Sequence, residues 1–279
     1  MQIDNSLDVA GLSPAVARFF DLAGGKILRL QAEWDPARGT PVFTAAGKYT
    51  TRGWTEWTEG FLYGCQLVQF DATGDEQFLE LGRRNTLAKM AMHVSHTGVH
   101  DHGFNNVSTY GNLWRLCREG RIEGAPREID IYTLALKVSG AVQASRWTTL
   151  SDGSGFIYSF NGPHSLFSDT IRSCRILVLA HMLGHALMGE NDRKISLLER
   201  ALQHIRATLR FNVYYGEGRD AYDVPGRVVH ESLFNTNDGN YRCPSTQQGY
   251  SPFSTWTRGL AWVLLGCAEE LECLSSLPE

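Results

Sequence analysis

Three short segments of the sequence carry side chains that could act as acids or bases. His100-Asp-His-Gly-Phe104 holds Asp101, Asp169 opens a long apolar segment, and His230 follows an apolar pair in a polar region. A carboxyl group that is desolvated, or that lies near another carboxylate, has a raised pKa and can act as a general acid near neutral pH. If these segments meet in space, they supply two carboxyl groups and a histidine for proton transfer.

Each segment also has a commoner, non-catalytic interpretation. The glycine of His100–Phe104 can mark a turn in which Asp101 bonds to its own backbone. Asp169 can cap the helix that follows it, and His230 can be a loop histidine with no task. The residue types alone leave both interpretations open.

Aromatic rings and a cation are concentrated near the end of the sequence. The stretch Thr246-Gln-Gln-Gly-Tyr250 leads into Ser254-Thr-Trp-Thr-Arg-Gly-Leu-Ala-Trp262. Trp and Arg so close together are costly in a core unless the Arg has a partner. Sugar-binding clefts use such sets, because flat rings stack on the apolar faces of a pyranose and Arg binds a carboxylate. Core packing capped by a salt bridge would use the same residue types.

No metal or cofactor site is predicted. His93, His96, His100 and His102 lie close together in the sequence, and His181 and His185 are one helical turn apart. A zinc site would need a third ligand and a partnering Glu, which His181-Met-Leu-Gly-His185 lacks. The sequence also contains no glycine-rich phosphate loop and no Gly-x-Ser-x-Gly elbow. We therefore expect no metal and no cofactor, and no serine hydrolase.

Helical periodicity dominates the chain, with no alternating strands outside short loop pieces. The predicted helices span residues 13–35, 54–70, 75–94, 105–118, 127–147, 169–188, 192–213 and 253–273. The joints Asp71–Asp75 and Leu187–Asp192 both predict an apolar helix that ends at a Gly, followed by a helix with an acidic cap. Repeated hairpins of this kind indicate an all-α toroid or solenoid of helical pairs.

Three long connections rich in Gly, Asp, Asn, Ser and His interrupt this pattern: residues 94–106, 147–168 and 214–254. Long loops in a compact helical domain usually carry function. Each precedes a predicted buried helix, so a toroid would place all three on one rim. Asp101, Asp169 and His230 would then lie near Trp57, Trp256 and Arg258, in one cleft.

Composition limits the class of protein. The chain has 279 residues, a formal charge of −4 and a pI near 6.1, which argue against a general nucleic-acid or membrane-surface binder. No secretory signal is visible at Met1–Asn5, and no apolar run approaches the ~20 residues that span a bilayer. The six scattered cysteines indicate reduced, mostly buried thiols. These features predict a cytoplasmic protein.

Four motifs in order resemble the unsaturated glucuronyl hydrolases and the related unsaturated rhamnogalacturonyl hydrolases. They are Trp57-Thr-Glu-Gly-Phe61, His100-Asp-His-Gly-Phe104, Asp169 before a central helix, and the Thr246–Tyr250 turn leading into Trp256-Thr-Arg-Gly-Leu-Ala-Trp262. Order and spacing agree over about residues 54–262. The resemblance implies an (α/α)6 barrel and hydration of the C4=C5 vinyl ether in unsaturated uronic-acid oligosaccharides, which polysaccharide lyases produce.

The resemblance also implies roles for individual residues. Asp169 would act as acid and then as base, and Asp101 would orient the substrate and help to keep Asp169 protonated. Six further residues would bind substrate: Trp57 and Trp262 by stacking, Arg258 through the uronate carboxylate, His230 and Gln248 through hydroxyls or the water, and His100 beside Asp101. Gln247 replaces a histidine of the family turn, which puts one substrate contact in doubt.

The predicted helices are fewer than the twelve of the family barrel. We expect about eight helices in a single domain over residues 1–279, without the C-terminal hairpins of the family. The chain would then be a fragment, a shortened homologue or a protein completed by a partner. Exposed hairpin flanks would favour a homo-oligomer.

Two other functions stay open. A helical-barrel glycosidase or epimerase of other specificity would act on saturated sugars; an inverting glycosidase needs its carboxylates ~6.5–9.5 Å apart. A non-catalytic carbohydrate-binding homologue would bind the unsaturated sugar and leave its double bond intact.

Overall fold

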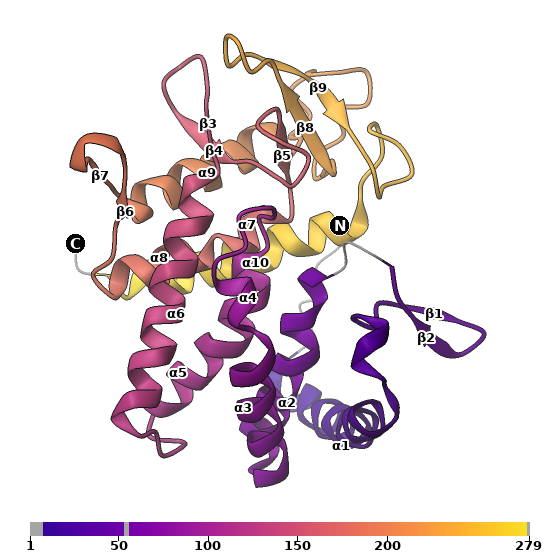
Figure 1. Cartoon of the computed structure of the whole chain (residues 1–279). Helices are drawn as coiled ribbons and strands as arrows, with labels where there is room; N and C mark the ends of the chain where they lie inside the picture. The colour runs from indigo at the N-terminus through magenta and orange to yellow at the C-terminus, as the bar shows by residue number, and fades with distance from the viewer. Residues whose placement is uncertain (1–7, 53–55, 278–279) are drawn as a thin grey trace.

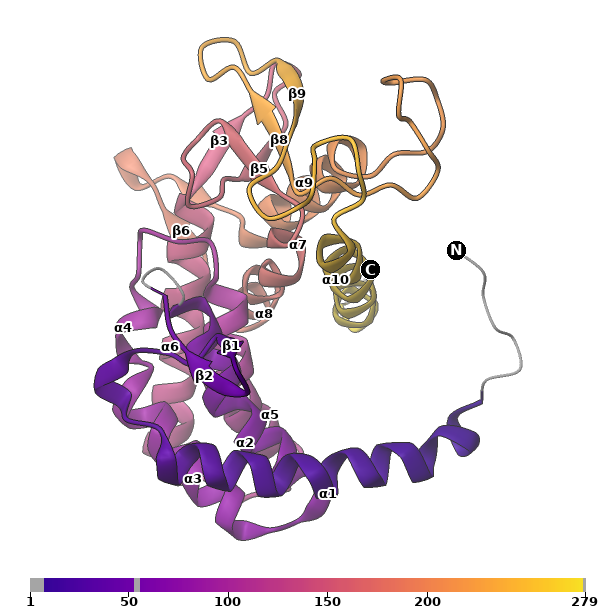
Figure 2. The ribbon, with the colours of Figure 1, turned by 90° about the vertical axis from the view of Figure 1, so that its right-hand side faces the viewer.

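The computed structural model describes residues 8–52 and 56–277, and most of its regular structure is helical (Figure 1). The α-helices are α1 (Val9–Glu33), α2 (Glu59–Thr73), α3 (Glu76–Lys89), α4 (Ala91–Val94), α5 (Asn112–Arg118), α6 (Pro126–Ser145), α7 (Thr170–Ser173), α8 (Arg175–Met182), α9 (Leu197–Phe211) and α10 (Thr257–Ser275). A π-helix, η3 (Gly103–Gly111), leads directly into α5, and short 3-10 turns occupy Pro36–Arg38, Glu56–Thr58 and Glu190–Asp192. Figure 2 shows the helices in an arc that is open between α1 and α10. The predicted all-α toroid is confirmed.

Strands are short and lie in the connections between helices. Three antiparallel pairs join β1 (Phe43–Ala45) to β2 (Lys48–Thr50), β3 (Trp147–Thr149) to β4 (Gly155–Ile157), and β6 (Leu187–Met188) to β7 (Lys194–Ile195). A three-stranded sheet has the order β5 (Ser165–Phe167), β8 (Glu231–Phe234) and β9 (Tyr241–Ser245). Phe167 on β5 pairs with Glu231 on β8, and the Ser168 N–H donates to the His230 carbonyl at 3.0 Å. This sheet therefore brings the start of α7 beside the segment that carries His230.

Each predicted helical segment contains a helix of the structure, but the ends differ, and the segments 75–94 and 169–188 are each broken into two helices, at Met90 and Cys174. The start predicted at Trp54 lies outside the described residues, and α2 begins at Glu59. The Asp71–Asp75 joint is as predicted, because Gly74 has a φ of 71° and the Asp75 side chain accepts the Gln77 N–H.

The joint predicted at Leu187–Asp192 is wrong. Helix α8 ends at Met182, and Gly184 supplies the positive φ, at 76°. Residues 187–195 form the β6–β7 hairpin instead, and the Ser196 hydroxyl caps α9 by accepting the Glu199 N–H. An acidic residue after a glycine suits a hairpin turn as well as a helix start, so the local pattern could not separate the two.

The main core lies where α2, η3, α6 and α8 pack together, around Leu67, Leu113, Tyr132, Leu136 and Leu177. The six cysteines are free thiols, but only Cys174 is buried, so the prediction of mostly buried thiols is wrong. Among the described residues, no helix is both long and apolar enough to cross a bilayer.

Glu270 is a buried carboxyl group on α10 that predicts a pH-dependent stability. It is 2% exposed, and neither carboxyl oxygen has a hydrogen-bond partner among the described residues. Burial raises its pKa to about 8, against the opposing charges of Arg175 and Arg172. Because this pKa lies above the unfolded value near 4.5, the native state loses stability as pH rises from about 4.5 to about 8.

We therefore expect Glu270→Gln to stabilise the protein at pH 8, by on the order of 2–4 kcal/mol, and to have little effect at pH 4.5. Chemical denaturation at both pH values measures this. Glu272→Gln is the matched control, because the Glu272 side chain is 77% exposed on the same helix. A gain for Glu270→Gln that is equal at both pH values would contradict the assignment.

Candidate active site

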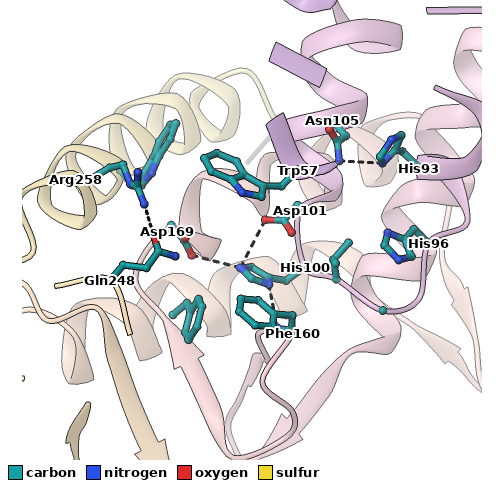
Figure 3. Close-up of a pocket in the computed structure, with 14 residues that line it drawn as sticks. Trp57, His93, His96, His100, Asp101, Asn105, Phe160, Asp169, Gln248 and Arg258 are labelled. Atoms are coloured by element: carbon teal, nitrogen blue, oxygen red, sulfur yellow. Dashed lines mark hydrogen bonds and ion pairs between the residues drawn. The ribbon is translucent and has the colours of Figure 1, made fainter. Parts of the chain in front are cut away.

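One cavity of about 340 Å³ gathers residues from all three long connections (Figure 3). Its walls come from the 3-10 turn before α2, from α4 and the chain that leads into η3, from the β4–β5 loop and β5, from the start of α7, and from the segment from β9 into α10. They are formed by Trp57, His93, His96, Gly98, Val99, His100, Asp101, Asn105, Phe160, Phe167, Asp169, Gln248, Arg258 and Trp262. Seven of the nine predicted site residues therefore line one cavity.

Asp101 lies just before the π-helix η3 and does not make the turn that its sequence permits. Gly103 is in the first turn of η3, and a Cβ atom there would lie 2.1 Å from the Ser173 carbonyl oxygen. The Gly103 N–H donates to the Ser173 hydroxyl at 2.9 Å. The glycine therefore allows η3 to touch α7, and this contact brings Asp101 close to Asp169.

Asp169 occupies the N-cap position of α7, but its side chain makes no capping hydrogen bond. The carboxylate faces the cavity instead, together with Asp101 (Figure 3). Asp101 and Asp169 are 6% and 9% exposed, so both are largely desolvated while they remain open to the cavity. A carboxyl group that is not used for capping is available for chemistry.

His100 lies between the two carboxyl groups. Its Nε2 atom is 3.4 Å from Asp169 Oδ1 and 3.7 Å from Asp101 Oδ1 (Figure 3). Its Nδ1 atom accepts the backbone N–H of Phe160 at 3.1 Å. The ring therefore connects both carboxyl groups to the β4–β5 loop.

The two carboxyl groups differ in their affinity for a proton. Burial raises the pKa of Asp101; His100 opposes this, the charge of Asp169 adds to it by a smaller amount, and the net pKa stays raised. Burial also acts to raise the pKa of Asp169, but the hydrogen bond and charge of His100, with His230 and Arg258, outweigh it and lower the pKa. In the ligand-free site, Asp101 therefore holds a proton more tightly, and Asp169 is the more readily ionised of the two carboxyl groups.

A cation and two tryptophans line the same cavity. Arg258, in the first turn of α10, donates to the Gln248 side-chain oxygen (Figure 3). Trp57 and Trp262 line the cavity and both pack against Phe104, with ring centroids 6.0 and 4.9 Å away. The same rings therefore serve the core on one side and offer apolar surface to the cavity on the other.

Two predicted site residues do not line this cavity. His230 is 1% exposed and is packed between the rings of Phe167 and Trp256, at 4.3 and 4.4 Å. Its Nδ1 atom accepts the Gln247 N–H at 3.0 Å, and its Nε2 atom has no partner among the described residues. The Gln247 side chain is exposed, away from the cavity walls. His230 thus borders the site from behind the Phe167 ring.

Three further residues, His93, Phe160 and Arg146, shape the site without having been predicted from the sequence. His93 accepts an N–H of Asn105 at its Nδ1 atom and meets Glu59 at its Nε2 atom, at 3.1 and 2.8 Å. Phe160 donates its N–H to His100. Arg146 is buried beneath the loops and donates to the carbonyls of Thr97, Tyr158 and Ser159. No local pattern marks these residues, because their roles arise from contacts between distant segments.

In the part of the chain that the structure describes, no group of three or more His, Cys, Asp or Glu side chains is arranged to hold a metal ion.

Comparisons with known proteins find relatives of similar sequence. No family model matches the chain. It is 28% identical over 232 residues to an unsaturated glucuronyl hydrolase of Bacillus sp. (strain GL1), and 24% identical over 237 residues to an unsaturated chondroitin disaccharide hydrolase of Streptococcus pyogenes serotype M1. Both matches cover 81% of this chain. The chain resembles the unsaturated glucuronyl hydrolases.

The fold agrees with the sequence match. The crystal structure of the unsaturated glucuronyl hydrolase from Bacillus sp. GL1 superposes with a TM-score of 0.69 at 22% identity, covering 92% of this chain and 63% of that one. The expected α/α-barrel type of fold is therefore confirmed. The chain spans about half the length of the curated relatives that it matches, 54% and 51%.

Proposed function

We propose that the protein is a glycoside hydrolase that acts on unsaturated uronic-acid oligosaccharides, by hydrating the C4=C5 vinyl ether. The observation that carries the proposal is the pair of buried carboxyl groups, Asp101 and Asp169, that face one cavity beside Arg258 and two tryptophans. The similarity to enzymes named as unsaturated glucuronyl and unsaturated chondroitin disaccharide hydrolases supports the same reaction class.

The reaction needs one group that first gives and then takes a proton, and we assign this to Asp169. Its carboxyl group protonates C4, which leaves positive charge on C5 shared with the ring oxygen. Water adds to C5 and returns a proton to the Asp169 carboxylate. The hemiketal opens by cleavage of the bond between C5 and the ring oxygen, and C1 then releases the remaining sugar. One water is consumed and Asp169 ends as it began.

Substrate binding would place the proton where it is needed. In the ligand-free site the hydrogen bond from His100 and the charge of neighbouring Arg258 lower the pKa of Asp169, and burial favours the proton on Asp101. A uronate carboxylate bound to Arg258 would neutralise one of these neighbours and bring a like charge close to Asp169. Both effects raise the pKa of Asp169, so the bound substrate favours its protonated form.

The part of the cavity wall formed by the two tryptophans and Gln248 suits the sugar ring. Trp57 and Trp262 offer apolar surface for stacking, and Gln248 presents an amide next to Arg258. Arg binds carboxylates through two parallel N–H groups, which fixes the direction of a planar uronate. The substrate would lie with its carboxylate toward α10 and its double bond toward Asp169.

The ultraviolet absorbance of an unsaturated uronyl disaccharide tests the proposal. We expect the absorbance to fall with time in the presence of the protein, because hydration removes the conjugated double bond. A saturated disaccharide of the same sugars should stay intact. Binding of the unsaturated sugar without loss of absorbance would overturn the assignment in favour of a sugar-binding protein, and cleavage of the saturated sugar would favour a conventional glycosidase.

A further inference from the structure

Both ring nitrogens of His100 are already engaged within the protein. The Phe160 N–H points at Nδ1 from 3.1 Å, so this nitrogen must offer a lone pair. The proton of the ring is then on Nε2, which faces Asp169 and Asp101 at 3.4 and 3.7 Å. No nitrogen of the ring is left for a sugar hydroxyl.

Protein rings also cover the His100 imidazole. Phe160 stacks on it with an interplanar angle of 16° and a centroid distance of 6.1 Å, and the Phe167 ring meets it edge-on at 5.5 Å. The residue is 2% exposed, although it contributes to the cavity wall. A sugar in the cavity would therefore meet the two carboxyl groups before it met His100.

We propose that His100 is a positioning residue: the Phe160 N–H holds it as the neutral tautomer with its proton on Nε2, and this N–H fixes Asp169 and Asp101 toward one point in the cavity. His100 belongs to the same site as the two carboxyl groups, and the effects expected on kcat and KM rest on the proposed hydration reaction. The positioning role replaces the direct substrate contact that sequence resemblance assigned to this residue.

The charges around His100 bear on its protonation. Burial lowers its pKa, while Asp101 and Asp169 raise it and prevail over burial and the charge of Arg146. A second proton on the His100 ring would have to sit on Nδ1, where it would face the Phe160 N–H. The hydrogen bond from Phe160 therefore opposes the positively charged form of the ring, which the two carboxylates favour. His230 and His204 also lie nearby, and burial lowers the pKa of both, to about 3 for His204; His93 and His96 are further histidines on the cavity wall. Two permanent cations act on the carboxyl groups: Arg146, fixed by three backbone carbonyls, on Asp101, and Arg258 on Asp169.

Two substitutions separate positioning from sugar binding. His100→Met keeps the bulk and removes the N–H, whereas His100→Gln keeps a donor near the Nε2 position. We expect His100→Met to lower kcat by about 10²-fold with KM almost unchanged, because a displaced acid costs rate and not affinity. His100→Gln should recover part of this loss.

The pH dependence of kcat/KM distinguishes positioning from a purely structural role, because a purely structural role would leave it unchanged. Loss of the Nε2 donor raises the pKa of Asp169, which must be protonated to act as the acid, so the alkaline limb of kcat/KM should shift to higher pH in His100→Met and less in His100→Gln. A rise in KM with unchanged kcat and an unchanged pH profile would overturn the proposal and return His100 to the substrate contacts.

The tautomer can be measured without any turnover. A long-range ¹H–¹⁵N correlation spectrum of the wild-type protein at pH 7.5, with the His100 signals identified by their absence in His100→Gln, should show a proton on Nε2 and none on Nδ1. A doubly protonated ring or an Nδ1–H tautomer would overturn the proposal. If the wild-type protein does not consume the unsaturated disaccharide while the spectrum shows the Nε2–H tautomer, the proposed function fails and the tautomer assignment stands.

Discussion

Replacing Asp169 with asparagine is expected to lower kcat on an unsaturated uronyl disaccharide by about 10²–10⁴-fold, the usual contribution of a general acid–base group. The amide has nearly the shape of the carboxyl group but can neither deliver a proton to C4 nor accept one from water. The rate of absorbance loss under saturating substrate measures the effect. KM should stay close to the wild-type value, because the Arg258 and tryptophan contacts are unchanged.

The fold should survive this substitution, and the structure gives the reason. Asp169 stands at the N-cap of α7 but makes no capping hydrogen bond, so the thermal midpoint of Asp169→Asn should match the wild type. Asp75→Ala is the contrasting control, because the Asp75 side chain does cap α3. We expect it to cost about 1 kcal/mol of stability and to leave turnover unchanged. Near-normal turnover in Asp169→Asn would show that the proton comes from elsewhere.

The sequence predicted the centre of this site because the decisive residues stand in local motifs. Asp101 and Asp169 each lie at the start of a helical segment, after a long connection, and helical hairpins bring such starts to one side of a toroid. Arg258 and Trp262 are four residues apart on one helix, so their shared direction follows from helical geometry alone. For these four residues, element type and order were enough to predict that they line one cavity.

The supporting contacts could not be predicted, because they join segments that are distant in sequence and carry no pattern of their own. Phe160 acts on His100 through a backbone N–H, which any residue other than proline would supply. Arg146 follows a helix end, where a basic residue has an ordinary explanation. His230 was predicted to line the cavity with the carboxyl groups and lies behind Phe167 instead, because its ring packs between the rings of Phe167 and Trp256. In each case, tertiary contact decides the role.

Gly103→Ala is expected to disrupt the site although it adds only one methyl group. A Cβ atom at this position would lie 2.1 Å from the Ser173 oxygen and 2.6 Å from its Cα and carbonyl carbon. These are backbone atoms, so η3 and α7 must separate to make room. Overpacking of this kind typically costs 1–3 kcal/mol, and a shift of about 1 Å between Asp101 and Asp169 costs about 10²-fold in rate. Thermal melting and the disaccharide assay measure the two effects.

Gly111→Ala provides a matched control at the other end of the same π-helix. There the nearest atom to an added Cβ is a methyl group of Val107, at 3.3 Å, which a small side-chain movement can accommodate. This variant should keep wild-type turnover and melt near the wild-type temperature. If Gly103→Ala behaved like Gly111→Ala, the contact of η3 with α7 would not be what sets the carboxyl pair. Loss of rate in Gly103→Ala with little loss of stability would give the strongest support for the contact of η3 with α7 as what sets the carboxyl pair. The methyl group touches neither carboxyl group, so it would act only through the spacing of the two helices.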